Sequence, residues 1–187
     1  MSFYKQEELD NMNFKHLGKN VLISDKCSIY NAKNISIDDN TRIDDFAILS
    51  AGEGGIEIGK YVHIACFATL IGKGKIKMCD YSGLSSRVAV YSSSDSYDGE
   101  WMTNPCLPSN VTNTIHKDVF LGKHVVVGSG SVVLPGVTLE DGCSVGALSL
   151  VNKSVEEFKV IVGVPAKVVK DRKRNILDLE KKIGKWK

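Results

Sequence analysis

The sequence predicts an all-β chain wound into a parallel β-solenoid, and two observations carry this prediction. A bulky apolar residue recurs at every sixth position between residues 115 and 154, and a small or β-branched residue follows each one four positions later. A period of six fits neither an amphipathic helix, which repeats about every 3.6 residues, nor an alternating strand. The bulky residues are Ile115, Leu121, Val127, Val133, Leu139, Val145 and Val151; the residues that follow are Val119, Val125, Ser131, Val137, Cys143, Ser149 and Val155.

Each six-residue unit is expected to form one short strand and one corner. Glycines stand between the apolar positions, where the backbone must turn sharply and a positive φ costs glycine little. A single coil of this kind cannot bury its own apolar residues, so the stability must come from the stacking of neighbouring coils.

The same register extends upstream, with two interruptions. Irregular spacers at 52–55 and 72–75 predict small bulges at corners of the coil. The upstream pairs are Ile23 and Cys27, Ile37 and Thr41, Ile43 and Ala47, Ile58 and Val62, Ile64 and Ala68, Met78 and Ser82, Leu84 and Val88, and Val90 and Ser94.

The 187 residues are predicted to form a single domain of four parts. These are an N-terminal cap (1–20) with a helical run from Glu7 to Phe14, a β-helix (21–168), a loop insertion within it (96–114), and a C-terminal helix (169–187). In the last part an apolar stripe at helical spacing predicts the helix. The stripe consists of Ile176, Leu177, Leu179 and Ile183.

Composition limits the classes of function. A net charge of +2 is too small to indicate a nucleic-acid-binding protein, and the first residues resemble neither a signal peptide nor a lipid anchor. We therefore expect a cytoplasmic protein that binds no membrane. The cysteines are odd in number and widely spaced, so Cys27 and Cys143 are interpreted as buried apolar filler, and Cys106 as the candidate for a reactive thiol.

Four segments carry a resemblance to a known family: residues 120–122, 127–130 and 134–138, and the sequence Gly-Val-Pro-Ala-Lys at 163–167. They resemble the left-handed parallel β-helix, hexapeptide-repeat acyltransferases, and within these the galactoside and maltose O-acetyltransferase branch. The resemblance implies a homotrimer that uses acetyl-CoA as co-substrate, with each active site in the groove between two neighbouring subunits.

The resemblance also implies a coenzyme site. Ser129, Ala147 and Asn152 would lie along the pantetheine arm, while Lys167 and Lys170 would lie near the phosphates, where two ammonium groups complement the anionic charge. The alternative is structural: any tightly turning coil favours small residues, and the basic cluster near the C-terminus would be a solvated helix face.

The insertion at 96–114 breaks the period and is rich in aromatic and acidic residues. Long loops on a rigid scaffold commonly carry binding residues, so we expect it to contact a sugar acceptor; alternatively, it packs on the neighbouring subunit. The candidate substrate-binding residues are Ser94, Tyr97, Asp98, Glu100 and Trp101.

The chain departs from the family pattern at the general base. In the resembling enzymes this loop begins with a His-Pro pair, whereas Ser93-Ser94-Asp95-Ser96 stands here. We therefore interpret His63 as a replacement base, and we expect Asp95 of the neighbouring subunit to orient its ring or to bind the acceptor. The alternative for His63 is an ordinary polar corner residue. His116 and His124 are expected to be solvated. A base is not needed if the acceptor is an amine, which favours an amino sugar.

The sequence thus predicts an acetyl-CoA-dependent acetyltransferase, O- or N-, that acts on a sugar or nucleotide-linked amino sugar in surface polysaccharide biosynthesis. Two alternatives stay open. One is a non-catalytic trimeric scaffold, which the missing His-Pro pair favours. The other is a zinc carbonic anhydrase, which needs three converging histidines; their spacing here argues against it, and no metal is expected.

Overall fold

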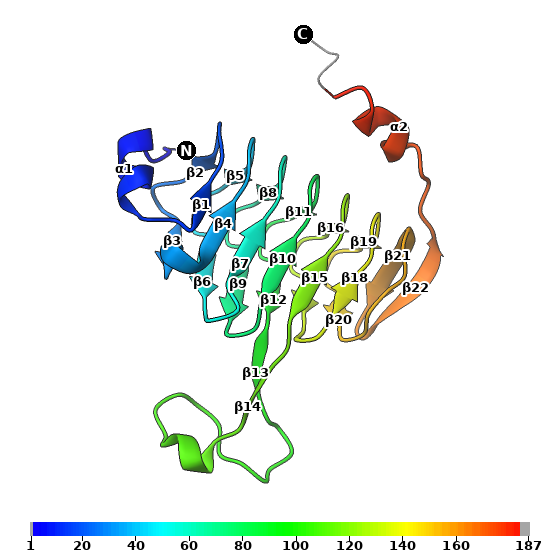
Figure 1. Cartoon of the computed structure of the whole chain (residues 1–187). Coiled ribbons are helices and arrows are strands. Elements are labelled where there is room, and N and C mark those ends of the chain that lie inside the picture. Colours follow the sequence, from blue (N-terminus) through cyan, green and yellow to red (C-terminus); the bar gives the residue numbers. More distant parts are fainter. Residues whose placement is uncertain (1, 184–187) are drawn as a thin grey trace.

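Three sheets run along the sides of a three-sided coil in the computed structural model, which describes residues 2–183 (Figure 1), and their strands are parallel except for the last strand of the second sheet. Sheet one contains β1 (His16–Leu17), β4 (Ile35–Ile37), β7 (Ile56–Ile58), β10 (Ile76–Met78), β15 (Val119–Leu121) and β18 (Thr138–Leu139). Sheet two contains β2 (Leu22–Ile23), β5 (Arg42–Ile43), β8 (His63–Ile64), β11 (Gly83–Leu84), β16 (Val126–Val127), β19 (Ser144–Val145), β21 (Lys159–Gly163) and β22 (Ala166–Asp171). Sheet three contains β3 (Ser28–Tyr30), β6 (Ile48–Ala51), β9 (Thr69–Gly72), β12 (Ala89–Tyr91), β17 (Val132–Val133) and β20 (Leu150–Val151).

The inward apolar residues stack in register from coil to coil. On sheet two, Ile43 pairs with Ile64, Ile64 with Leu84, and Leu84 with Val127, and all four side chains are buried. Each buried residue is thus covered by its counterparts in the coils before and after it. The predicted solenoid and the predicted apolar positions are confirmed here.

Small polar residues occupy some inward corner positions without leaving a polar group unsatisfied. The hydroxyl of Thr41 donates to the carbonyl of Gly59 at 2.8 Å, and that of Ser82 donates to the carbonyl of Cys79 at 2.6 Å. A buried hydroxyl is tolerated when a backbone carbonyl accepts its proton. These corners therefore accept serine or threonine as readily as alanine or valine.

The spacers at 52–55 and 72–75 form enlarged corners, as predicted. They lie directly on one another in successive coils. A Cβ at Gly54 would stand 2.4 Å from the backbone nitrogen of Lys75, so only glycine fits at this close approach.

The insertion differs from the sequence prediction at both ends. β13 (Ser93–Asp95) and β14 (Thr114–His116) pair as an antiparallel ribbon that projects from the coil, and a 3-10 helix (Ser109–Val111) lies at its far end (Figure 1). Ile115 is 42% exposed, and Ser94 pairs with it, so neither is an inward residue of a coil. The last buried apolar residue before the ribbon is Val90, the fully buried Ser92 follows it, and the apolar register resumes at Val119, because the ribbon and not a corner joins these coils.

The two ends of the coil are capped in different ways. Helix α1 (Gln6–Asn11) begins close to the expected position and buries Leu9; a 3-10 helix (Ala32–Asn34) forms a corner of the first coils. The predicted C-terminal helix (169–187) is wrong over most of its described length. β22 continues to Asp171 as an antiparallel partner of β21, and α2 spans only Ile176–Glu180. Pairing with β21 satisfies backbone groups that a helix from residue 169 would leave open.

Two further expectations concern buried thiols and membrane spans. Cys27 and Cys143 are buried as expected, and burial raises the pKa of Cys27 to about 12, whereas Cys106 is exposed.

Within residues 2–183, every helix is too short or too polar to cross a bilayer.

A pair of isoleucines tests the corrected register. Ile64 is fully buried, so Ile64→Ala should lower the free energy of unfolding by about 2–5 kcal/mol in urea titrations. Ile115→Ala removes the same atoms from the exposed ribbon and should cost about 0.5 kcal/mol or less. Equal losses at the two positions would contradict the assignment of Ile115 to the ribbon.

The contact that holds α2 should depend on pH. Glu180 accepts hydrogen bonds at 2.7 Å from both Lys123 Nζ and His124 Nε2, and these bonds lower the pKa of the Glu180 carboxyl. An acid with a depressed folded-state pKa stabilises the fold above its ordinary pKa, and this stabilisation is lost as the pH falls through the folded value. Glu180→Gln should therefore lower the Tm at pH 7, and the difference from the wild type should vanish under acidic conditions. A difference that is constant down to pH 3 would contradict this contact.

Candidate functional site

A cavity of about 360 Å³ lies on sheet two, at its corner with sheet three. His63 on β8, Gly83 on β11 and Val126 on β16 occupy the same outward position in three successive coils, so the parallel register lines them up. Corner residues complete the cavity. Its lining residues are His63, Ala65, Gly83, Leu84, Ser85, Ser86, Val126 and Ser129.

The imidazole of His63 is held by a carboxylate of its own chain. Its Nε2 lies 2.9 Å from Oδ2 of Asp44, and Arg42 Nε donates to the other carboxylate oxygen at 2.7 Å. Burial alone would raise the pKa of Asp44, whose side chain is only 10% exposed, but the hydrogen bonds from Arg42 and His63 outweigh it and lower the pKa. An ionised Asp44 therefore orients the His63 ring at neutral pH.

Sequence reasoning missed Asp44, although a signal for it existed. Arg42 pairs with His63 across neighbouring coils, and Asp44 is the first corner residue after β5. Applying the register to the outward residues, as well as to the inward ones, places Asp44 beside His63.

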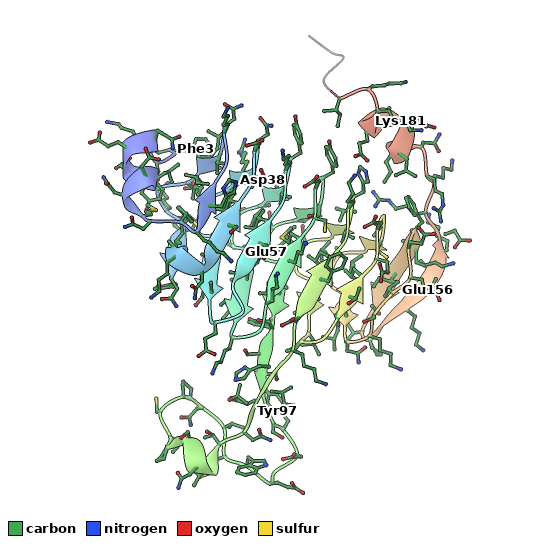
Figure 2. All side chains as sticks on the ribbon, in the orientation of Figure 1. Phe3, Asp38, Glu57, Tyr97, Glu156 and Lys181 are labelled. Atoms are coloured by element: carbon green, nitrogen blue, oxygen red, sulfur yellow. The ribbon has the colours of Figure 1, made fainter. Side chains whose placement is uncertain are left out.

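Asp95 does not meet His63 within one chain. It lies on β13, where it accepts a hydrogen bond from Thr114 Oγ1 at 3.2 Å, and it lines a different cavity of about 710 Å³ together with Ser94 and Tyr97. Figure 2 shows Tyr97 on the ribbon, away from the labelled residues of the coil. The orienting role expected for Asp95 is thus filled by Asp44 in the isolated chain, and any contact between Asp95 and His63 requires a second copy.

The other predicted acceptor residues are spread along the ribbon. Asp98 accepts a hydrogen bond from the backbone of Glu100 at 2.9 Å, and hydrogen bonds from Ser96 and Glu100 lower the pKa of the Asp98 carboxyl. This carboxylate therefore shapes a local turn. Glu100 and Trp101 are both exposed.

The predicted pantetheine residues fall at two corners. Ser129 lines the His63 cavity, and Ala147 occupies the equivalent place in the next coil, so close that a Cβ at Gly128 would stand 2.5 Å from the Ala147 nitrogen. Asn152 is exposed and follows β20, at the next corner of the coil. The structure brings Ser129 and Ala147 together but separates Asn152 from them by a strand of sheet three.

The basic side chains near the C-terminus fall into two groups, two arginines that bind other parts of the chain and two lysines that are exposed. Arg172 donates to the carbonyls of His124 and Gly142, and Arg174 pairs with Glu157, so both cations hold the chain in place. Lys167 and Lys170 are exposed on β22, and within residues 2–183 neither forms an ion pair. These two ammonium groups are therefore available to bind anions.

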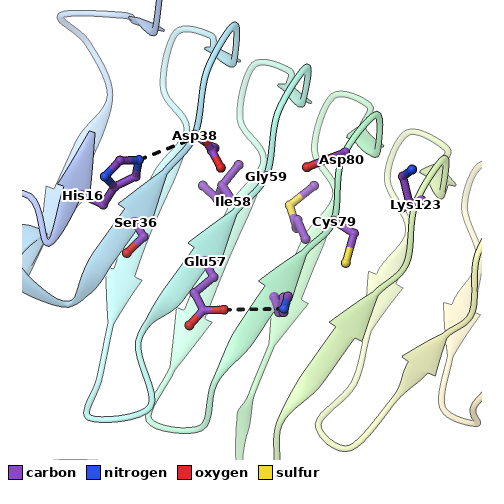
Figure 3. A pocket seen from close by; sticks show the side chains of 11 residues that line it. His16, Ser36, Asp38, Glu57, Ile58, Gly59, Cys79, Asp80 and Lys123 are labelled. Carbon is purple, nitrogen blue, oxygen red and sulfur yellow. Dashed lines mark ion pairs between the residues drawn. The ribbon is translucent and has the colours of Figure 1, made fainter. Parts of the chain in front are cut away.

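A second cavity, of about 400 Å³, lies over sheet one (Figure 3). Several of its charged side chains already form ion pairs. Glu57 pairs with Lys75 at 2.7 Å and with Lys77 at 3.9 Å, and His16 lies 3.9 Å from Asp38. Lys123 pairs with Glu180 at 2.7 Å. These ion pairs make it a weaker candidate than the His63 cavity, which is lined by Ser85, Ser86 and Ser129 and in which Ser86 Oγ lies 3.3 Å from Cys66 Sγ.

The remaining histidines have separate partners. The expectation of a solvated His124 is wrong: its side chain is 10% exposed, bonds Glu180 and stacks on Tyr81. His116 lies on the ribbon, where its Nδ1 is 2.7 Å from the Ser93 hydroxyl. The three imidazoles expected of a zinc carbonic anhydrase therefore do not converge, and residues 2–183 contain no cluster of three potential metal-binding side chains.

Known proteins similar to this chain are transferases. The family described as "Bacterial transferase hexapeptide (six repeats)" matches residues 115–153. A dTDP-4-amino-4,6-dideoxy-D-glucose acyltransferase from Escherichia coli is 51% identical over 96% of this chain and 94% of its own length. The crystal structure of AntD, an N-acyltransferase from Bacillus cereus in complex with dTDP and 3-hydroxybutyryl-CoA, is 44% identical with a TM-score of 0.92, covering 98% of this chain and 97% of that one.

The likeness to the maltose O-acetyltransferases is more distant. Such an enzyme from Clostridium difficile is 20% identical with a TM-score of 0.62, covering 90% of this chain and 75% of its own, which establishes the fold alone. The predicted left-handed β-helix is thereby confirmed, while the galactoside and maltose branch receives no specific support.

Proposed function

Because the chain belongs to the bacterial hexapeptide-repeat acyltransferases, we propose that it transfers an acyl group from an acyl-CoA to the amino group of a dTDP-linked 4-amino-4,6-dideoxy sugar. The observation that carries the proposal is the 51% identity, over almost the whole chain, to an enzyme named for that acceptor. The structural likeness to an N-acyltransferase bound to dTDP and an acyl-CoA supports it.

An amine acceptor suits the groups that line the His63 cavity. The unprotonated amine attacks the thioester carbon, a C–N bond forms, and the C–S bond breaks. The departing thiolate of coenzyme A takes up the proton released from nitrogen and becomes the free thiol. In this proposal His63, which Asp44 orients, accepts this proton in passing, and the serine hydroxyls at the corner bind the amine or the thioester oxygen.

The distribution of the candidate residues supports a homotrimer. His63 and the acceptor residues of the ribbon line different cavities of one chain, so a neighbouring copy is needed to place Asp95, Ser94 and Tyr97 beside His63. In this arrangement Ser129, Ala147 and Asn152 contact the pantetheine arm, and Lys167 and Lys170 bind the phosphates. A cytoplasmic location and a role in surface polysaccharide biosynthesis belong to the same proposal.

The acceptor is tested by measuring thiol release from acetyl-CoA with a panel of dTDP-sugars. The 4-amino-4,6-dideoxy sugar should be acylated, and the corresponding 4-hydroxy sugar should not, because a hydroxyl is a far weaker nucleophile without a strong base. Exclusive acylation of the hydroxy sugar would overturn the amine assignment. A chain that binds the nucleotide and coenzyme without transfer would be the non-catalytic scaffold instead.

The role of the Asp44–His63 pair is tested with two substitutions. His63→Asn should lower kcat by about tenfold or more, since general-base assistance contributes on the order of 10²–10⁴. Asp44→Asn should lower it less and shift the pH profile, because it removes the orienting charge. The matched control is His16→Asn, which removes an imidazole beside Asp38 on sheet one and should leave kcat unchanged. Normal turnover in His63→Asn would exclude it as a base.

Subunit mixing tests whether the site forms between copies. His63→Asn and Asp95→Asn trimers should each be impaired, and unfolding and refolding them together at equal ratio should restore about a quarter of the wild-type activity. This follows because every mixed trimer contains one interface where His63 meets an intact Asp95. Activity no greater than the mean of the two parents would contradict the shared site.

A further inference from the structure

The outward position of sheet two carries one residue without a side chain. The parallel register aligns Arg42, His63, Gly83, Val126 and Ser144 in successive coils, and of these only Gly83 lacks a Cβ. The missing side chain leaves a gap in this column, between the His63 imidazole and the Val126 side chain, inside the candidate cavity.

The fold itself does not require glycine at this position. A Cβ built on Gly83 would meet only the carbonyl oxygen of His63, at an ordinary contact distance of 3.5 Å, and the φ of Gly83 lies outside the left-handed region. At Gly59, in contrast, a Cβ would stand 2.5 Å from the Asp80 side chain. Glycine inside a strand weakens it and often marks the close approach of a ligand.

The chemistry of the gap indicates what fills it. Gly83 offers no side-chain hydrogen-bond partner, and of its two neighbours in the column, His63 is the proposed base whereas Val126 is apolar. The side of the gap at Val126 suits a hydrocarbon better than a sugar hydroxyl. Ser129, expected to contact the pantetheine arm, lines the same cavity. We propose that Gly83 leaves the space for the acyl chain of the CoA thioester and sets the largest acyl group that the enzyme accepts. This inference rests on the proposed function.

The test compares donors of increasing length in Gly83→Ala and Gly83→Val. With the dTDP-4-amino sugar as acceptor, the wild type should use acetyl-, propionyl- and butyryl-CoA. The ratio of kcat/KM for butyryl-CoA to that for acetyl-CoA should fall about tenfold or more in Gly83→Val, with Gly83→Ala in between, because one methylene in a filled pocket is worth roughly 10–200-fold.

Controls separate a filled pocket from a damaged fold. Ser144→Val adds a β-branched side chain two coils further along the same column, outside the cavity lining, and should leave the donor ratio unchanged. The Tm of Gly83→Ala should equal or exceed that of the wild type, since the position imposes no strain, and its oligomeric mass should be unchanged.

The outcomes distinguish this inference from the function on which it rests. An unchanged donor ratio, an equal loss for all donors, or a wild type confined to acetyl-CoA would overturn the role of Gly83 while leaving acyl transfer in place. A wild type that releases no thiol from any donor, although it is folded, would overturn the proposed function and this inference together.

Discussion

In-register stacking of inward side chains is the constraint on which the whole structure depends. One coil exposes its apolar residues to the coils above and below, and only an identical placement in the neighbours removes them from water. On sheet two this places Ile43, Ile64, Leu84 and Val127 in one buried row. A shift of the strand pairing by one residue would turn the entire buried row toward solvent, so the register is strongly specified at every strand.

The same register organises the outer surface. The third residue of many corners has a backbone in the left-handed conformation, with positive φ, which is unusual for a residue with a bulky side chain. Because this conformation recurs at equivalent corners of successive coils, the aromatic rings at these positions stack on one another. Phe46 stacks on Phe67 with centroids 5.0 Å apart, and Tyr61, Tyr81 and His124 form a second ladder. His124 is thereby buried between a ring and Glu180, which explains why it is not the solvated corner residue that its position in the hexad suggested.

The site depends on the register for its alignment and on the irregular segments for its completion. His63, Gly83 and Val126 come from three coils and share one outward position, so their spacing is as rigid as the core behind them. The ribbon of β13 and β14 leaves the coil at a different corner and carries Asp95 away from this cavity. A single chain therefore presents the two parts of the proposed site separately, and a neighbouring copy must join them.

The six-residue period determined the solenoid and the inward residues outside the ribbon, because these follow from which side chains must avoid water, and the interruptions of the period located the two enlarged corners. Three other matters became clear only in the tertiary structure. Ile115 matches the period yet lies in a ribbon, since the spacing of residues does not reveal where the chain leaves the coil. The C-terminal segment pairs with β21 instead of continuing as a helix, since an unpaired edge offers backbone partners that no sequence stripe records. Asp44 meets His63 across two coils, since outward neighbours are set by strand pairing and not by proximity along the chain.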